Sequence, residues 1–165
     1  RRELDYTKSQ IYTNQMTTDF VPIPGLAASF YCEEACHAIV TATFNAKERL
    51  LFPGSGVDRE SKTGVLSTVM EKENFKAAEF KLFVNGSAVK GTSRNLFISQ
   101  KEPATPIEDL TGKNLSICCM VELVAGINDV SVQIQPKIES SSVSKDEFFH
   151  IYVSFRQMHV EALLK

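Results

Sequence analysis

The segment Asp129–Gln135 reads D-V-S-V-Q-I-Q, and its alternation of apolar and polar residues decides the fold class. Successive side chains of a β-strand point to opposite faces of the sheet, so Val130, Val132 and Ile134 share one face. The polar residues between them share the other face. This pattern is typical of a strand with one buried and one solvated face.

The same alternation recurs along much of the chain and predicts about nine strands, whereas helical periodicity is weak throughout. The residues expected to face inward are Val40, Ala42 and Phe44; Phe80, Leu82 and Val84; Leu115, Ile117, Cys119, Val121 and Leu123; and Phe149, Ile151, Val153 and Phe155. Further candidate strands cover residues 27–31, 65–70, 94–99 and 158–164.

Turn signals separate these segments. Asn85-Gly86 is the strongest hairpin signal in the chain, because it follows an alternating strand and both residues tolerate a positive φ. Residues 125–128 (A-G-I-N) join two alternating strands at a length typical of a second hairpin. Many short strands separated by turns indicate an all-β sandwich or barrel. We expect a jelly-roll β-sandwich, since an immunoglobulin core needs a tryptophan that this chain lacks.

The length and the net charge of the chain exclude several classes of function. The 165 residues correspond to one domain, which we expect at 17–165, preceded by an extended polar arm at 1–16. The formal net charge of −2 lacks the basic footprint of a nucleic-acid-binding protein. No apolar run reaches the roughly 18 residues of a membrane span. Because the chain begins at Arg1 without an apolar signal segment, we expect it to be a piece of a longer chain.

Four segments carry a resemblance to a known family: residues 20–26 (FVPIPGL), 42–46 (ATFNA), 80–86 (FKLFVNG) and 123–133 (LVAGINDVSVQ). Together they resemble the compact heads of the C1q and tumour-necrosis-factor-like superfamily, over roughly residues 17–164. The resemblance implies a jelly-roll sandwich of about ten antiparallel strands that assembles as a homotrimer. It also implies an extracellular, cytokine-like head, secreted or displayed on a stalk, that binds a protein receptor or a surface partner.

The four cysteines form two pairs. Cys32 and Cys36 flank a predicted loop, whereas Cys118 and Cys119 are adjacent in a predicted strand. Because adjacent strand residues point to opposite faces, only Cys119 is expected to face inward. We predict at least one disulfide, with its pairing open, and four reduced thiols are the alternative. A metal site with His37 is disfavoured, because the spacing fits no standard zinc pattern.

Two sequons make Asn85 and Asn114 candidate glycosylation sites. For Asn85 the predicted turn offers a second reason for the residue, since asparagine tolerates the positive φ of a tight turn, and we favour that role. Whether either site carries a glycan stays open.

Catalytic signals are missing from the sequence. The three histidines have no nucleophile elbow such as G-x-S-x-G beside them, and the paired carboxylates fall in predicted loops or at strand starts. The glycine patterns that hold phosphates do not occur. We therefore expect no enzyme activity, no cofactor and no metal.

Some aromatic residues fall on the face opposite the expected core, and an apolar second face suggests cover by another element or another subunit. The candidates for an oligomer interface are Phe83, Phe97, Phe148 and Tyr152. The leading hypothesis is a homotrimeric binding head for a protein receptor or surface partner, with no nucleic-acid partner. The alternative is a carbohydrate-binding lectin module, because jelly rolls often bind glycans.

Overall fold

A computed structural model describes residues 10–13, 19–51, 75–98, 113–139 and 148–163. Within these ranges the chain forms strands and no helix, and every strand pairing is antiparallel. The strands are β1 (Gln10–Thr13), β2 (Val21–Cys32), β3 (Cys36–Leu51), β4 (Phe75–Val84), β5 (Ser87–Ala88), β6 (Arg94–Ile98), β7 (Lys113–Leu123), β8 (Gly126–Glu139) and β9 (Phe148–Leu163). The all-β prediction is therefore confirmed.

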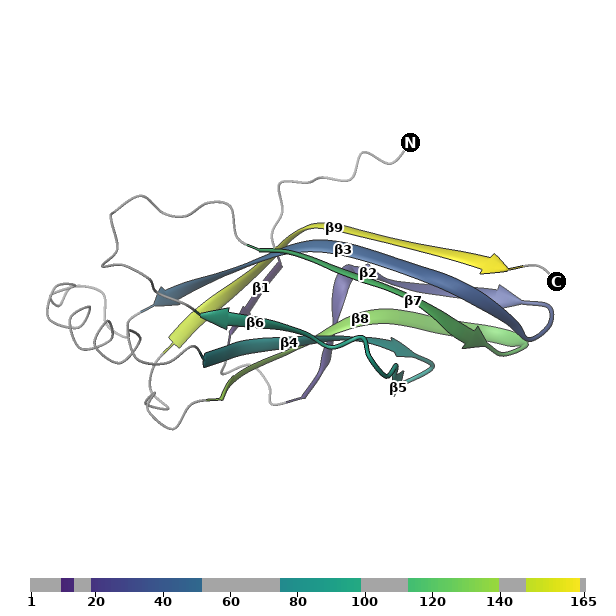
Figure 1. The fold of residues 1–165 in the computed structure, drawn as a ribbon, viewed down its shortest axis with the longest axis horizontal. Coiled ribbons are helices and arrows are strands. Elements are labelled where there is room, and N and C mark those ends of the chain that lie inside the picture. Colours follow the sequence, from purple (N-terminus) through teal and green to yellow (C-terminus); the bar gives the residue numbers. More distant parts are fainter. Residues whose placement is uncertain (1–9, 14–18, 52–74, 99–112, 140–147, 164–165) are drawn as a thin grey trace, which may run out of the picture.

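The strands form two sheets that pack against each other (Figure 1). Sheet A has the order β1-β9-β3-β7, and sheet B has the order β2-β8-β4-β5, with β6 also paired to β4. The rings of Phe44 on β3 and Phe80 on β4 meet between the sheets at a centroid distance of 4.8 Å. Edge strand β2 carries Pro22 and Pro24.

The core consists largely of the side chains that alternation placed inward. Val132, Ile134, Phe80 and Leu82 have no exposed surface, and they pack in one cluster with residues from sheet A. Leu115, Val84 and Cys119 are partly buried against the same cluster. Each fully buried aliphatic side chain contributes about 1.5–3 kcal/mol through the hydrophobic effect.

The hairpin predicted at Asn85-Gly86 is confirmed. Asn85 has φ of 50° and Gly86 has φ of 80°, which is the left-handed pair that a type I′ turn requires. The turn joins β4 to β5, and Val84 pairs with Ser87 across it.

The connection at residues 125–128 is not a hairpin. Strand β7 pairs only with β3 in sheet A, whereas β8 pairs with β2 and β4 in sheet B. The chain therefore crosses from one sheet to the other at this point. Alternation could not reveal the crossing, because both strands bury one face against the same core in either arrangement.

A bulge in β9 overturns the inward assignment of Phe155. Thr43 pairs with Gln157, but Asn45 pairs with Ser154, so the register shifts between these pairs. Phe155 has φ of 49° and is 62% exposed. The extra residue turns its side chain outward, while the flanking Val153 and Met158 still pack on the core. The segments expected as two strands, around 149–155 and 158–164, are one bent strand.

Part of the expected N-terminal arm pairs with the sheet. Residues 10–13 form edge strand β1 against β9, and Tyr12 is 5% exposed there. The rest of that arm and the candidate strand at 65–70 lie outside the described residues. No helix long and apolar enough to cross a membrane occurs in the described ranges.

Candidate functional site

The end of the molecule where β2 leads into β3 and β7 leads into β8 lies on the right in Figure 1. The segments that meet there carry three exposed large apolar side chains. Tyr31 is 70% exposed and pairs across strands with Ile127, which is 71% exposed. Val124, in the β7–β8 connection, is 54% exposed. We call Tyr31, Val124 and Ile127 the tip surface. Exposed apolar clusters of this kind mark interaction sites in soluble proteins.

A buried asparagine holds the backbone beneath the tip surface. Asn128 has no exposed surface, and its side-chain Oδ1 accepts the backbone N–H of Val124 at 3.0 Å. Its Nδ2 donates to the carbonyl of Val124 at 2.8 Å and to that of Gly126 at 3.2 Å. The side chain thus supplies the hydrogen bonds that a crossing without sheet pairing would otherwise leave unmade.

Asn85 joins this network from the β4–β5 hairpin. Its Nδ2 donates to Asn128 Oδ1 at 3.0 Å, and its backbone N–H donates to the carbonyl of Asp129 at 2.8 Å. The backbone N–H of Asp129 donates back to Asn85 Oδ1 at 2.8 Å. The nitrogen to which a glycan would be attached is therefore engaged in a hydrogen bond that supports the tip surface.

Several carboxylates lie at the same end of the molecule as the tip surface. Glu33 and Glu34 are exposed in the loop that follows β2, and Asp129 is exposed on β8, where Ser29 donates a short hydrogen bond to it. The Glu122 side chain is 89% exposed and lies 3.8 Å from His37 Nε2. Exposed apolar side chains with carboxylates at the same end of the molecule complement a partner surface that is apolar and basic.

All four cysteines are free thiols in this structure, so the predicted disulfide is not seen. Cys32 and Cys36 are half-buried at the tip end of the molecule. Cys118 is exposed and lies 3.7 Å from the Thr41 hydroxyl, whereas Cys119 packs toward the core. In the described part of the chain no group of three His, Cys, Asp or Glu residues could hold a metal ion.

The outer face of sheet A is a second exposed surface. Met120 on β7 is 61% exposed, and it pairs with the half-buried Ile39 on β3. Further along this face, the bulged Phe155 stands beside a shallow pocket of about 280 Å³ lined also by Thr43, Asn114 and Ser116. We call Ile39, Met120 and Phe155 the sheet A surface.

Asn114 belongs to the wall of that pocket. Its Oδ1 accepts a hydrogen bond from Nδ2 of Asn45 at 3.0 Å, and Asn45 is 7% exposed. Asn114 itself is exposed.

The predicted interface aromatics whose side chains the structure describes lie on both sheets. Phe83 is half-buried beneath Phe20 of the same chain, with ring centroids 5.4 Å apart. Phe97 is 41% exposed on β6 of sheet B, and Tyr152 is half-buried on β9 of sheet A. The side chain of Phe148 lies outside the described ones.

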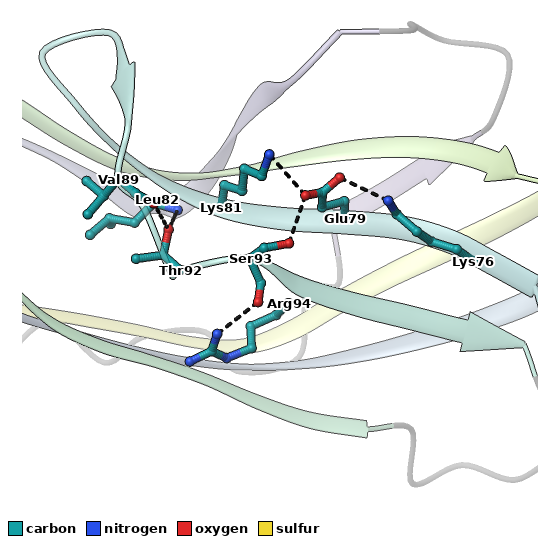
Figure 2. A network of polar contacts seen from close by, with 8 residues as sticks. All are labelled: Lys76, Glu79, Lys81, Leu82, Val89, Thr92, Ser93 and Arg94. Carbon is teal, nitrogen blue, oxygen red and sulfur yellow. Dashed lines mark hydrogen bonds and ion pairs between the residues drawn. The ribbon is translucent and has the colours of Figure 1, made fainter.

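A network of polar contacts links β4 to the segment that leads into β6. Figure 2 shows Glu79 between Lys76 and Lys81, whose Nζ atoms lie 3.0 and 3.1 Å from its carboxylate oxygens. The Ser93 hydroxyl donates to the same carboxylate at 2.7 Å. Burial raises the pKa of Glu79, but the hydrogen bonds from Ser93, Lys76 and Lys81 outweigh it and lower the pKa to about 2. A carboxylate that stays ionised near neutral pH and has several hydrogen-bond donors is suited to holding strands together rather than to proton transfer.

The same network ties the two sheets together. The Thr92 hydroxyl donates to the Val89 carbonyl at 2.7 Å and accepts the Leu82 N–H at 3.1 Å (Figure 2). Arg94 Nε donates to the carbonyl of Ser116 on β7 at 2.9 Å, which links β6 of sheet B to sheet A.

No family model matches the sequence, and no curated protein shows a significant match to it. Sequence reasoning missed the tip surface because Tyr31, Val124 and Ile127 lie in separate segments, and only the sheet register brings them together. Asn128 had a local signal, an asparagine directly after a glycine-containing turn, but its burial depends on the crossing between sheets.

Proposed function

We propose that this chain is an extracellular binding head with a jelly-roll fold, which self-associates through the sheet A surface and engages a protein partner through the tip surface. The observation that carries the proposal is the exposed Tyr31–Ile127 pair with Val124, held in place by the buried Asn128. Binding residues positioned by a rigid scaffold are typical of interaction domains.

The strand order supports the jelly-roll assignment. Without the two-residue β5, each sheet has four strands, β1-β9-β3-β7 and β2-β8-β4-β6. Apart from the β4–β5–β6 segment, each pair of consecutive strands is divided between the two sheets. Repeated crossing between two antiparallel sheets is typical of a jelly roll, and it agrees with the family that the sequence resembles.

Self-association is supported by the sheet A surface. Met120 and Phe155 expose more than half of their side-chain area on a sheet face whose other side covers the core. A closed homotrimer would bury both residues in repeated contacts between copies. The resemblance to trimeric heads provides the stoichiometry.

Light scattering of the purified chain tests this assembly. We expect a mass three times 18.4 kDa, and we expect Met120→Ser with Phe155→Ser to give a folded monomer. The matched control is Tyr31→Ser, which removes an equally exposed aromatic from the tip and should leave the trimer intact. A wild-type monomer at every concentration would overturn the assembly.

Binding of the labelled protein to cell surfaces tests the tip. Tyr31→Ser and Ile127→Ser should each lower the bound fraction at least tenfold, because exposed aromatic and aliphatic anchors dominate binding energy. Binding should also weaken as salt is added, since the carboxylates at this end of the molecule attract a basic partner. Unchanged binding by both tip variants would exclude this surface.

A second candidate function is carbohydrate binding, favoured by the pocket beside Phe155. The pocket places an exposed aromatic ring next to the hydroxyls of Thr43 and Ser116 and the amide of Asn114. Sugars offer hydroxyl groups for such polar side chains and C–H faces for the ring.

A glycan array discriminates between the two functions. Carbohydrate binding predicts signals on particular glycans that Phe155→Ala abolishes and Tyr31→Ser leaves unchanged. The protein-binding head predicts no glycan signal and a cell-surface signal that depends on Tyr31.

A further inference from the structure

Two free thiols lie together where the chain passes from one sheet to the other. Cys32 is the last residue of β2 in sheet B, and Cys36 is the first residue of β3 in sheet A. Only residues 33–35 separate them, and both side chains pack partly buried against the core. The Cys36 thiol and the Asn128 side chain lie close enough to the Cys32 thiol to shift its pKa.

The other two cysteines have a different arrangement. Cys118 and Cys119 are neighbours in the middle of β7, so their side chains point to opposite faces of sheet A. Cys118 is exposed near Thr41, and Cys119 faces the core. A bond between them would require β7 to leave its extended pairing with β3.

We propose that Cys32 and Cys36 are a redox pair that closes into a disulfide joining the two sheets. This proposal does not depend on the proposed binding function. It selects one pairing out of those that four cysteines allow, because residues 33–35 alone separate Cys32 from Cys36 and both side chains pack against the core. A bond between them leaves both strands paired as they are.

A small-molecule disulfide such as oxidised glutathione is the oxidant for this closure. The thiolate of one cysteine attacks a sulfur of the oxidant, forms a mixed disulfide and releases one small thiolate. The thiolate of the second cysteine then attacks the protein sulfur of that mixed disulfide and releases the other. The two cysteine sulfurs are oxidised, the oxidant is reduced to two thiols, and those thiols take up the two protons.

The surroundings of Cys32 predict how closure depends on pH. Burial, the hydrogen bond with Cys36 and the proximity of that thiol raise the pKa of Cys32, and the hydrogen bond with Asn128 opposes them in part. Since the thiolate is the reacting form, closure should accelerate as the pH rises.

Thiol counting on the full chain tests the proposal. The reduced protein is incubated with oxidised glutathione, alkylated and measured as an intact mass, and its peptides are mapped. We expect the four alkylatable thiols to fall to two, with one Cys32–Cys36 crosslink and no retained glutathione. Four remaining thiols, a persistent glutathione adduct or a crosslink to Cys118 or Cys119 would each overturn the proposal.

Two single variants provide the matched comparison. Cys118→Ser should close with the wild-type rate, because it removes a thiol outside the pair. Cys36→Ser should form no crosslink within the chain under the same conditions, with circular dichroism confirming that it is folded. If Cys36→Ser does not fold, Cys32→Ser replaces it in the comparison. The peptide map of the wild-type chain tests the disulfide pairing without any substitution. A crosslink that persists in a folded Cys36→Ser variant would contradict the assignment.

Discussion

At the scale of single residues, Asn128 has the greatest influence on the candidate site. Its side chain makes four hydrogen bonds from a fully buried position, to Val124, to Gly126 and to Asn85. Buried polar groups that lose their partners are costly, so this residue determines whether the crossing between β7 and β8 keeps its shape. The tip surface depends on that shape more than on any contact among its own side chains.

Replacing Asn128 by alanine should destabilise the protein by about 3 kcal/mol, because the N–H and carbonyl of Val124 and the amide of Asn85 all lose a partner. Urea unfolding followed by circular dichroism measures the change. The control is Asn95→Ala, at an exposed asparagine on β6, which should shift stability by less than about 0.5 kcal/mol. Equal effects of the two substitutions would contradict the role assigned to Asn128.

At the scale of elements, turns and bulges decide where the alternating strands place their residues. The Asn85-Gly86 turn has the left-handed geometry that its sequence predicts, and it brings Asn85 to Asn128. The bulge in β9, by contrast, has no glycine or proline that would predict it from the sequence. It turns the side chain of Phe155 out of the core. A turn with a sequence signature is predictable, whereas a bulge that depends on pairing with β3 is not.

Gly86→Ala tests the turn. Gly86 has φ of 80° and no atom lies within 4 Å of an added Cβ, so the cost is backbone strain alone, about 1–2 kcal/mol. Thermal unfolding should show a lower Tm for this variant, while Ser87→Ala in the same hairpin should unfold near the wild-type Tm. If Gly86→Ala unfolded at the wild-type Tm, the positive φ would not matter for stability.

Much of the fold was predictable from alternation, but the site was not. Alternation identified Val130, Val132 and Ile134 as core residues, and their burial confirms it. It could not assign strands to sheets, because a strand buries the same face whether its neighbour in sequence lies beside it or opposite it. The tip surface depends on that assignment, since Tyr31 and Ile127 meet only through the pairing of β2 with β8. The placement of Cys32 at the end of β2 and of Cys36 at the start of β3 likewise depends on the crossing from sheet B to sheet A.

At the scale of the whole molecule, two titratable groups in opposite sheets limit the pH range of stability. Glu79 belongs to sheet B, and its pKa is lowered to about 2 by its hydrogen-bonding partners against the effect of burial. Tyr12 belongs to β1 of sheet A, and burial raises its pKa to about 12, with Arg156 opposing the shift. No hydrogen-bond partner for the buried Tyr12 hydroxyl occurs among the described residues.

Stability should therefore fall at both ends of the pH scale. Below pH 4.5 the unfolded chain takes up a proton at Glu79 more readily than the folded one, so about 2–3 kcal/mol is lost as the pH falls toward 2. Above pH 10 the unfolded chain releases the Tyr12 proton more readily, so about 2 kcal/mol is lost as the pH rises toward 12.

Urea midpoints across the pH range check both limbs. Glu79→Gln should reduce the loss of stability at acid pH, and Tyr12→Phe should reduce the loss at alkaline pH. Neither substitution should change the pH dependence at the other end. Glu161→Gln, at an exposed glutamate on β9, is the control and should leave both limbs as they are. An acid limb that kept its slope in Glu79→Gln would mean that other carboxylates cause it.

The prolines of β2 have a consequence for aggregation. Strand β2 is an edge strand of sheet B. At such an edge, a row of unpaired amides can pair with a strand from another molecule and extend the sheet. Pro22 and Pro24 have no amide hydrogen to offer, and Arg156 occupies the Pro24 carbonyl with a 2.7 Å hydrogen bond. This edge strand is therefore a poor template for amyloid-like growth. The proposed self-association therefore uses side-chain contacts on a sheet face and not an extension of sheet B at this edge.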